Sequence, residues 1–116
     1  PFFEYYQDDI RPFYEKKYPF LIDFNDEICN MVCSFIDIEP KILYTNSYSM
    51  NGDQIDDFRE IIHPKRDFST FDTDFIPKPY YQVFKDRFGF LPNLSIADLL
   101  FNMGPESLIV LRDSIR

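Results

Sequence analysis

Residues 92–107 read Pro-Asn-Leu-Ser-Ile-Ala-Asp-Leu-Leu-Phe-Asn-Met-Gly-Pro-Glu-Ser, and this stretch defines its own elements more clearly than any other. Ser95 can cap a helix whose third residue is Asp98, an arrangement close to a capping box. The apolar face of this helix consists of Ile96, Leu99, Leu100 and Met103. Gly104 is expected to end the helix. The Pro-Glu pair that follows suits the first turn of a last amphipathic helix, which the pattern extends to residue 115.

Helical periodicity recurs upstream of this stretch. The clearest case runs from about residue 21 to residue 37. Its apolar positions follow the i, i+3, i+4, i+7 spacing and are Leu21, Phe24, Ile28, Met31, Val32 and Phe35. Residues 1–20 also show helical spacing, but Pro12 predicts a break into two pieces. Residues 53–62 and 80–88 predict two shorter helices.

Two segments lack this helical pattern. Residues 41–46 (Lys-Ile-Leu-Tyr-Thr-Asn) predict a short strand, because β-branched and aromatic side chains are enriched there. Residues 65–78 have no helical period and predict a long loop of the kind that is often functional or mobile. We therefore expect a single-domain, mostly helical α+β fold with about five helices and one or two short strands. An all-α bundle is the alternative.

Composition and charge exclude several classes of function. The chain has 116 residues, of which 45% are hydrophobic, so it can bury a core. Its net charge of −8 disfavours binding to nucleic acids and to anionic membranes. The longest apolar run is far shorter than the roughly 20 residues that a transmembrane helix needs.

The cysteines and the histidine bear on compartment and metal binding. Cys29 and Cys33 lie one helical turn apart, a spacing that suits a disulfide poorly. We expect reduced thiols and a cytoplasmic location. His63 is the only histidine, so a two-cysteine metal site would lack ligands. We expect neither a bound metal nor a cofactor.

The segment His63-Pro64-Lys65-Arg66 is the only basic concentration in this acidic chain. Histidine is the side chain that ordinarily exchanges protons near neutral pH, so His63 is a candidate catalytic acid or base. Lys65 and Arg66 are candidates for binding a carboxylate or a nucleotide-sugar phosphate. The alternatives are a histidine that merely ends a helix and two solvated charges in a loop.

Further candidates for substrate binding lie in and before the helix that starts at Ser95. They are the polar residues Asn93, Asp98 and Asn102, together with the aromatic Tyr81. Structural roles are open for each of them: a turn for Asn93, a cap for Asp98, and the core for Tyr81. Asn102 lies one turn after Asp98, so the two share a helix face. We expect His63, Arg66, Asp98 and Asn102 to meet at one cleft if the chain is catalytic.

The residues that follow position 79 resemble a known family. The motif Pro-Asn-Leu-Ser-Ile-x-Asp-Leu-Leu-Phe-Asn-x-Gly-Pro-Glu at residues 92–106 follows a Tyr-x-x-Phe element at residues 81–84. Together they resemble the C-terminal signature of the WbqC-like protein family. The opening Pro1–Tyr6 and the segment His63–Arg66 also resemble its shorter members.

The resemblance implies a role in the assembly of bacterial surface polysaccharide (O-antigen). It further implies a transferase that moves glycine or another small acyl group onto a sugar, with a sugar or nucleotide sugar as substrate. It implies that the chain is the C-terminal part of a longer protein, partnered by the N-terminal half or by a second copy. The alternative is a non-catalytic binding or scaffolding module that uses the aromatic residues near the N-terminus: Phe2, Phe3, Tyr5, Tyr6 and Phe13.

Overall fold

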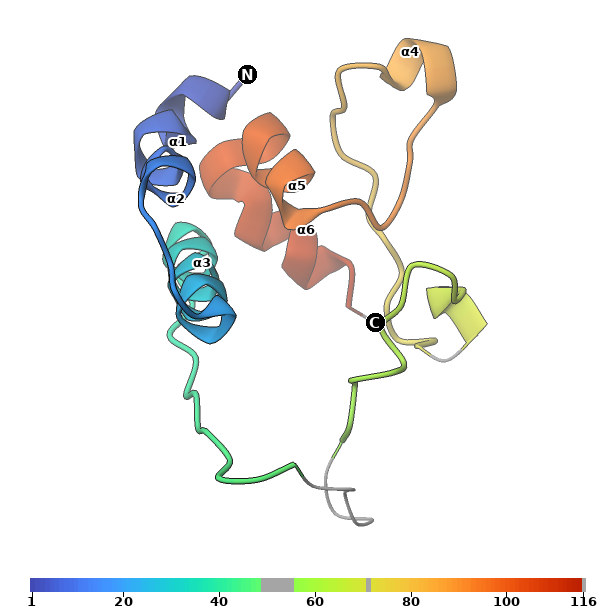
Figure 1. The fold of residues 1–116 in the computed structure, drawn as a ribbon. Coiled ribbons are helices and arrows are strands. Elements are labelled where there is room, and N and C mark those ends of the chain that lie inside the picture. The colour runs from blue at the N-terminus through green and yellow to red at the C-terminus, as the bar shows by residue number, and fades with distance from the viewer. Residues whose placement is uncertain (49–55, 71, 116) are drawn as a thin grey trace.

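The computed structural model describes residues 1–48, 56–70 and 72–115, and Figure 1 shows their arrangement. Four α-helices of seven residues or more are α1 (Phe3–Ile10), α3 (Leu21–Phe35), α5 (Ile96–Met103) and α6 (Ser107–Asp113). Single helical turns form α2 (Pro12–Glu15) and α4 (Lys85–Phe88). Two 3₁₀ turns, η1 (Phe68–Thr70) and η2 (Gly104–Glu106), complete the set. The described part of the chain is therefore mostly helical, as predicted.

Several helix boundaries follow the residues that predicted them, but the last helix, expected from Pro105 to residue 115, is shorter: Pro105 and Glu106 lie in η2 and α6 ends at Asp113. Pro12 occupies the first turn of α2, directly after α1 ends. Ser95 caps α5, because its side chain accepts a hydrogen bond from the amide of Ala97. Gly104 ends α5 with a φ of 55°, a left-handed conformation that glycine adopts at little cost.

The predicted strand at residues 41–46 is wrong. These residues are exposed and have no regular secondary structure, and among the described residues the only β-bridge is an isolated one between Phe75 and Ile115. Strand propensity stabilises a strand only where a second strand pairs with it, and no described segment lies there to do so. The described part of the chain thus fits the all-α alternative better than an α+β class.

Two predicted helices differ from the structure. Of the segment 53–62, residues 53–55 lie outside the described residues, and residues 56–62 contain a turn rather than a helix. The Asp57 carboxylate accepts hydrogen bonds from the amide and the guanidinium of Arg59, and such local bonds compete with helix formation. In the segment 80–88 only the last four residues are helical, because the side chain of Gln82 pairs with the backbone of Leu91 instead.

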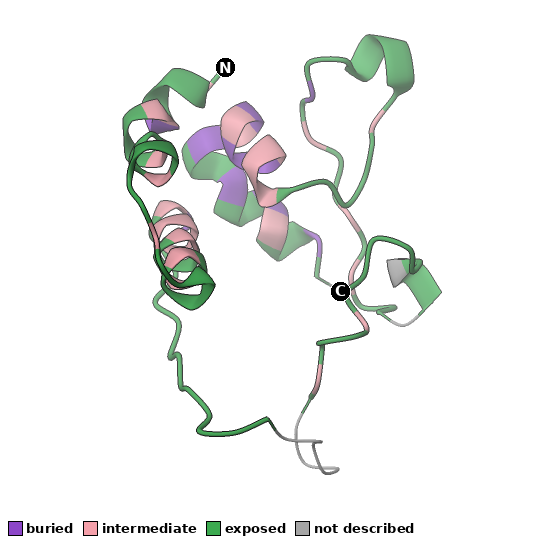
Figure 2. Ribbon diagram, in the orientation of Figure 1, coloured by how far each residue is buried: buried purple, intermediate pink, exposed green. Residues whose placement is uncertain are grey.

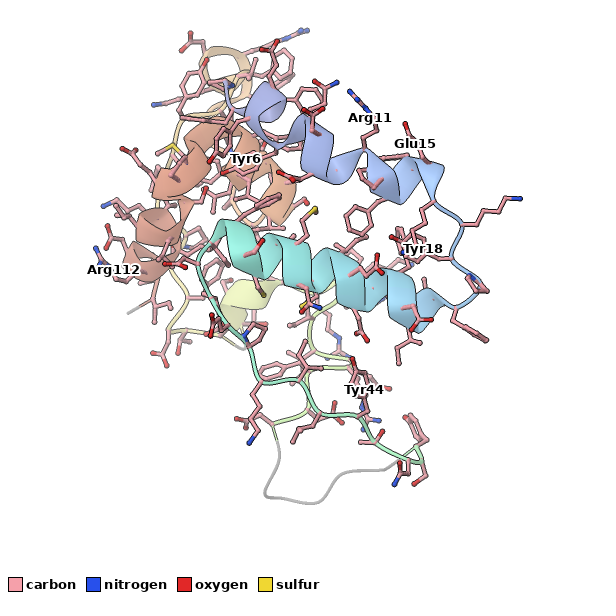
Figure 3. The ribbon with its side chains drawn as sticks, turned by 90° about the vertical axis from the view of Figure 1, so that its left-hand side faces the viewer. Tyr6, Arg11, Glu15, Tyr18, Tyr44 and Arg112 are labelled. Atoms are coloured by element: carbon pink, nitrogen blue, oxygen red, sulfur yellow. The ribbon has the colours of Figure 1, made fainter. Side chains whose placement is uncertain are left out.

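The core lies where α1, α3 and α5 meet. Tyr6, Ile36 and Leu100 are buried, and Figure 2 shows that buried residues concentrate in α5 and α6. The ring of Tyr6 lies 4.5 Å from that of Phe35. In Figure 3 Tyr6 points from α1 toward the C-terminal helices.

Helix α3 is held mainly by aromatic contacts at its two ends. Phe35 packs on the core, and Phe24 packs edge-on against the rings of Phe13 and Tyr18. The Tyr18 hydroxyl donates a hydrogen bond to Glu27, in the middle of α3. Even so, α3 has no fully buried residue. Its predicted apolar face is therefore only partly covered by the described residues.

Candidate functional site

Three loop segments enclose a pocket with a volume of about 460 Å³. The segments are residues 62–66, residues 72–75 and residues 93–95, the last of which leads directly into α5. We call this hollow the polar pocket. Its charged and polar lining residues are His63, Arg66, Asp72, Asn93 and Ser95. The volume lies within the range of about 300–1,000 Å³ that is typical of small-molecule sites.

The segment His63–Arg66 forms a tight turn. The amide of Arg66 donates to the carbonyl of His63 over 3.0 Å, and Pro64 occupies the second position, where its fixed φ is favoured. His63 and Arg66 therefore both line the polar pocket, at either end of the turn. Lys65 is exposed and does not line it. The basic motif is thus a turn that brings two of its three polar side chains together.

The turn also determines which ring nitrogen of His63 carries the proton. The amide of Lys65 donates to Nδ1 of His63 over 3.1 Å, so Nδ1 carries no proton in this arrangement. The neutral imidazole then carries its proton on Nε2. His63 is consequently suited to donate a hydrogen bond from Nε2. Removing a proton from a substrate at Nε2 would first require this tautomer to change.

The opposite walls of the pocket are held by local hydrogen bonds. Asp72 accepts from the amide of Phe75 over 3.2 Å, which closes a turn at this wall. Asn93 has a φ of 56°, a left-handed conformation that asparagine tolerates better than most residues. The turn predicted for Asn93 is therefore present, and it leaves the side chain at the pocket.

The chemistry of the polar pocket suits an anion. Among the residues that the structure describes, no carboxylate lies within 4.0 Å of the Arg66 guanidinium. Asp67, the next residue in the chain, accepts hydrogen bonds from the amide and hydroxyl of Ser69 in η1. These bonds lower the pKa of Asp67. Arg66 is thus a positive group with no described carboxylate at ion-pair distance, although the Asp72 carboxylate lines the same pocket.

Asp98 and Asn102 do not join His63 and Arg66. Asp98 accepts a hydrogen bond from the Tyr80 hydroxyl over 2.6 Å, and buried Asn102 donates to its carbonyl over 2.8 Å. Burial is the larger cause and the bond to Asp98 the smaller one, and together they raise the pKa of Tyr80 to about 12. Neither Asp98 nor Asn102 lines the polar pocket. The cleft expected from all four residues is therefore divided into a pocket and a separate network.

The lining of the polar pocket also differs from the prediction at other residues. Tyr81 is 53% exposed and lies outside the polar pocket. The pocket instead gains Asp72 and Ser95, which were not predicted. Asp72 lies in the loop that lacks a helical period, a signal that pointed to the segment but not to the residue. No cluster of three or more metal-ligating side chains occurs among the described residues.

None of the helices built from the described residues has the length and hydrophobicity needed to cross a lipid bilayer. The comparison with protein-family models matched the WbqC-like protein family over residues 1–70. This range contains the opening Pro1–Tyr6 and the turn His63–Arg66, whereas the motif at residues 92–106 lies beyond it. Neither the curated proteins nor the solved structures gave a match. Because the matched range covers more than half of the 116 residues, the chain belongs to the WbqC-like protein family.

Proposed function

We propose that this chain is part of a transferase of bacterial surface-polysaccharide (O-antigen) assembly and that the polar pocket binds the anionic group of its substrate. Membership of the WbqC-like family supports the first part. The second part rests on one observation: Arg66, with no described carboxylate at ion-pair distance, lines the same pocket as His63 and Asn93. Such a grouping is unusual in a chain with a net charge of −8.

Each side chain has a distinct role in this proposal. The planar guanidinium of Arg66 binds a carboxylate or phosphate through two parallel hydrogen bonds. The Asn93 amide adds a donor whose position is set by the left-handed turn. In an acyl transfer, a hydroxyl or amino group of the sugar adds to the carbonyl carbon of the glycyl or other small acyl group, and negative charge develops on the carbonyl oxygen. The charge returns when the bond from that carbon to the leaving group of the donor breaks. His63 stabilises that charge with a hydrogen bond from Nε2.

Four of the residues expected to act on the substrate are outside this proposal. Lys65, Tyr81, Asp98 and Asn102 do not line the polar pocket. Lys65 contributes through its backbone amide, which orients His63. Asp98 and Asn102 instead hold the start of the loop that precedes α5.

The test is a titration of ¹⁵N-labelled protein with acetate, glycine and inorganic phosphate, followed by amide chemical shifts. We expect the shifts to concentrate in His63, Lys65 and Arg66 and in residues 93–95. Arg66→Gln should weaken anion binding at least about tenfold, as expected for loss of a charge-assisted hydrogen-bonded pair. Lys65→Gln is the matched control, because it removes the adjacent charge outside the pocket, and it should change affinity less than about threefold.

Asn93→Gly distinguishes the contribution of the Asn93 side chain to anion binding from the contribution of the turn. Glycine keeps the left-handed backbone but removes the amide group, so the protein should fold normally and bind the anion more weakly. Anions that bind elsewhere, or an Arg66→Gln variant with unchanged affinity, would overturn the proposal.

A second candidate function is a non-catalytic binding module, and helix α3 favours it. Leu21 is 72% exposed and Ile22 is 55% exposed at the start of a helix with no fully buried residue. The aromatic patch first expected for this role is present only in part, because Phe3 and Tyr5 are exposed whereas Tyr6 is buried and Phe2 and Phe13 are half-buried. Sedimentation analysis over a concentration series tests this candidate: self-association that Leu21→Gln abolishes would support it, and a monomer at every concentration would count against a second copy as partner.

A further inference from the structure

A second, smaller hollow of about 170 Å³ lies against α5 and α6. We call it the apolar pocket. Its walls come from the segment 75–80, from Phe90 and from the two helices, and they include the hydrophobic residues Pro77, Leu99, Val110 and Leu111. The family resemblance assigned no role to this part of the molecule. The wall at residues 76–78 is rigidly attached, because both the carbonyl and the hydroxyl of Ser114 accept backbone hydrogen bonds from it.

The polar and apolar pockets adjoin. Phe75, Asn93, Leu94 and Ser95 line both of them. The segment 93–95 thus has the basic turn on one side and the apolar helix faces on the other. One bound molecule can therefore place a charged group beside Arg66 and the rest of its structure beyond Asn93.

Three polar side chains of the apolar pocket, those of Tyr80, Ser114 and Lys78, already have partners within the protein. The Tyr80 hydroxyl donates to Asp98 over 2.6 Å. The Ser114 hydroxyl donates to the carbonyl of Val110 and accepts from the amide of Lys78. The Lys78 ammonium lies 3.4 Å from Asp113. A ligand that enters this pocket consequently meets mainly hydrocarbon and aromatic surface.

The size of the apolar pocket indicates what it can hold. Its volume of about 170 Å³ is close to that of an apolar cavity of about 150 Å³ that binds benzene. A hydrocarbon group of about four to six carbons would fill it. Glycine has no such group, and acetate carries only a methyl.

We infer that the substrate bound here is an anion that also carries a short hydrocarbon group, such as a branched or linear acyl chain of about four to six carbons. This inference rests on the proposed function, because the anionic group is the one held by Arg66. It narrows the substrate class from any small acyl donor to one with an apolar part. The charged end lies in the polar pocket and the hydrocarbon end in the apolar pocket.

The experiment compares sodium acetate, butyrate and hexanoate on the full chain by amide chemical shifts. Hexanoate should bind at least about tenfold more tightly than acetate, since each buried methylene adds affinity. Its additional shifts should fall at residues 78, 80, 99 and 110–111. Arg66→Gln should weaken the binding of both acids by a similar factor, so the ratio of hexanoate affinity to acetate affinity should stay unchanged.

A pair of exposed leucines supplies a matched control. Leu94 is 46% exposed and lines both pockets, whereas Leu91 is 45% exposed and lines neither. Leu94→Trp should reduce the ratio of hexanoate affinity to acetate affinity to within about threefold of one, because the larger side chain would occupy the boundary that the two pockets share. Leu91→Trp should leave that ratio unchanged.

The possible outcomes separate the two proposals. If acetate binds at Arg66 and hexanoate binds no more tightly, the inference is overturned while the proposed function stands. If hexanoate binds tightly but shifts the residues of α3 instead, the inference is also overturned. If no carboxylate perturbs the polar pocket, both proposals fail.

Discussion

Asp98 illustrates how a single residue acquires its role from distant partners. Its carboxylate accepts hydrogen bonds from Tyr80 over 2.6 Å, from Asn102 over 3.3 Å and from Gln82 over 3.4 Å. Gln82 in turn binds both the amide and the carbonyl of Leu91. The loop between Tyr80 and Leu91 is thus closed at its base and attached to α5. The same bonds hold Tyr80 at the wall of the apolar pocket.

The Tyr80 phenol predicts a pH dependence of stability. Burial and the bond to Asp98 raise its pKa from 10.0 to about 12, so the folded state holds the phenolic proton more tightly than the unfolded state does. The stabilisation is therefore fully present below pH 10.0 and is lost as the pH rises toward 12. Tyr80→Phe should cost about 1.5 kcal/mol near neutral pH. The difference in unfolding free energy between wild type and variant should shrink above pH 10.0.

Urea unfolding at a series of pH values from about 8 to 12 measures this difference. Comparing the two proteins cancels the titration of groups that they share. Two stability curves that stay parallel across the whole series would contradict the assigned role of the Tyr80–Asp98 bond.

The candidate site could be predicted in part, and the reason lies in the chemistry of single residues. His63, Arg66 and Asn93 were identifiable because charge, proton exchange and turn formation are properties of the side chain itself. Asp98 was expected to bind substrate at a shared cleft or to serve the cap of α5, since sequence spacing shows only local partners. Its partner Tyr80 lies 18 residues away. Which residues meet is a property of the tertiary structure.

At the scale of the element, the end of α3 shows a well-defined termination. The amide of Ile38 donates to the carbonyl of Cys33 over 2.8 Å, and the amide of Asp37 donates to that of Ser34 over 3.2 Å. This pair of bonds is the Schellman motif. The motif requires a left-handed residue, and Asp37 supplies it with a φ of 59°. Glycine is the usual residue at this position because it has no Cβ.

Asp37→Gly is therefore expected to stabilise the protein by about 0.5–1 kcal/mol. Two effects contribute: relief of backbone strain and removal of a negative charge beside the helix C-terminus. Asp37→Asn distinguishes them, because it removes the charge and keeps a side chain that tolerates the left-handed region. The midpoint temperature of thermal unfolding should be highest for the glycine variant, lower for the asparagine variant and lowest for the protein with Asp37. A destabilised glycine variant would contradict this account.

The predicted elements succeeded where periodicity and end signals agreed. Helices α3, α5 and α6 each combine an apolar face with residues suited to their ends, and all three form. The segments 41–46 and 56–62 had propensity or periodicity alone. The first finds no strand among the described residues, and in the second a side-chain bond between Asp57 and Arg59 displaces the helix.

At the scale of the whole molecule, the N-terminal segment is attached to the C-terminal helices. The amide of Phe2 donates to the carbonyl of Phe101 over 2.7 Å, and Phe2 packs against the core. The approach is close because residue 104 is glycine: a Cβ there would lie 2.6 Å from the Phe2 ring. Gly104 therefore ends α5 and also admits the N-terminal segment. This contact joins parts of the chain that are about as distant in sequence as its length allows.

Gly104→Ala tests this attachment, and the chain offers a control for backbone strain. Gly89 also has a positive φ, but a Cβ there would have no neighbour within 4 Å. Gly89→Ala should lower the free energy of unfolding only by the backbone strain, about 1–3 kcal/mol. Gly104→Ala should cost about 1–3 kcal/mol more, because the Phe2 ring must move. In a Phe2→Ala background this additional cost should disappear, which a double-mutant cycle measured by urea unfolding would detect. Equal costs for the two alanine variants, or additivity with Phe2→Ala, would mean that the N-terminal segment is not held at α5 in solution.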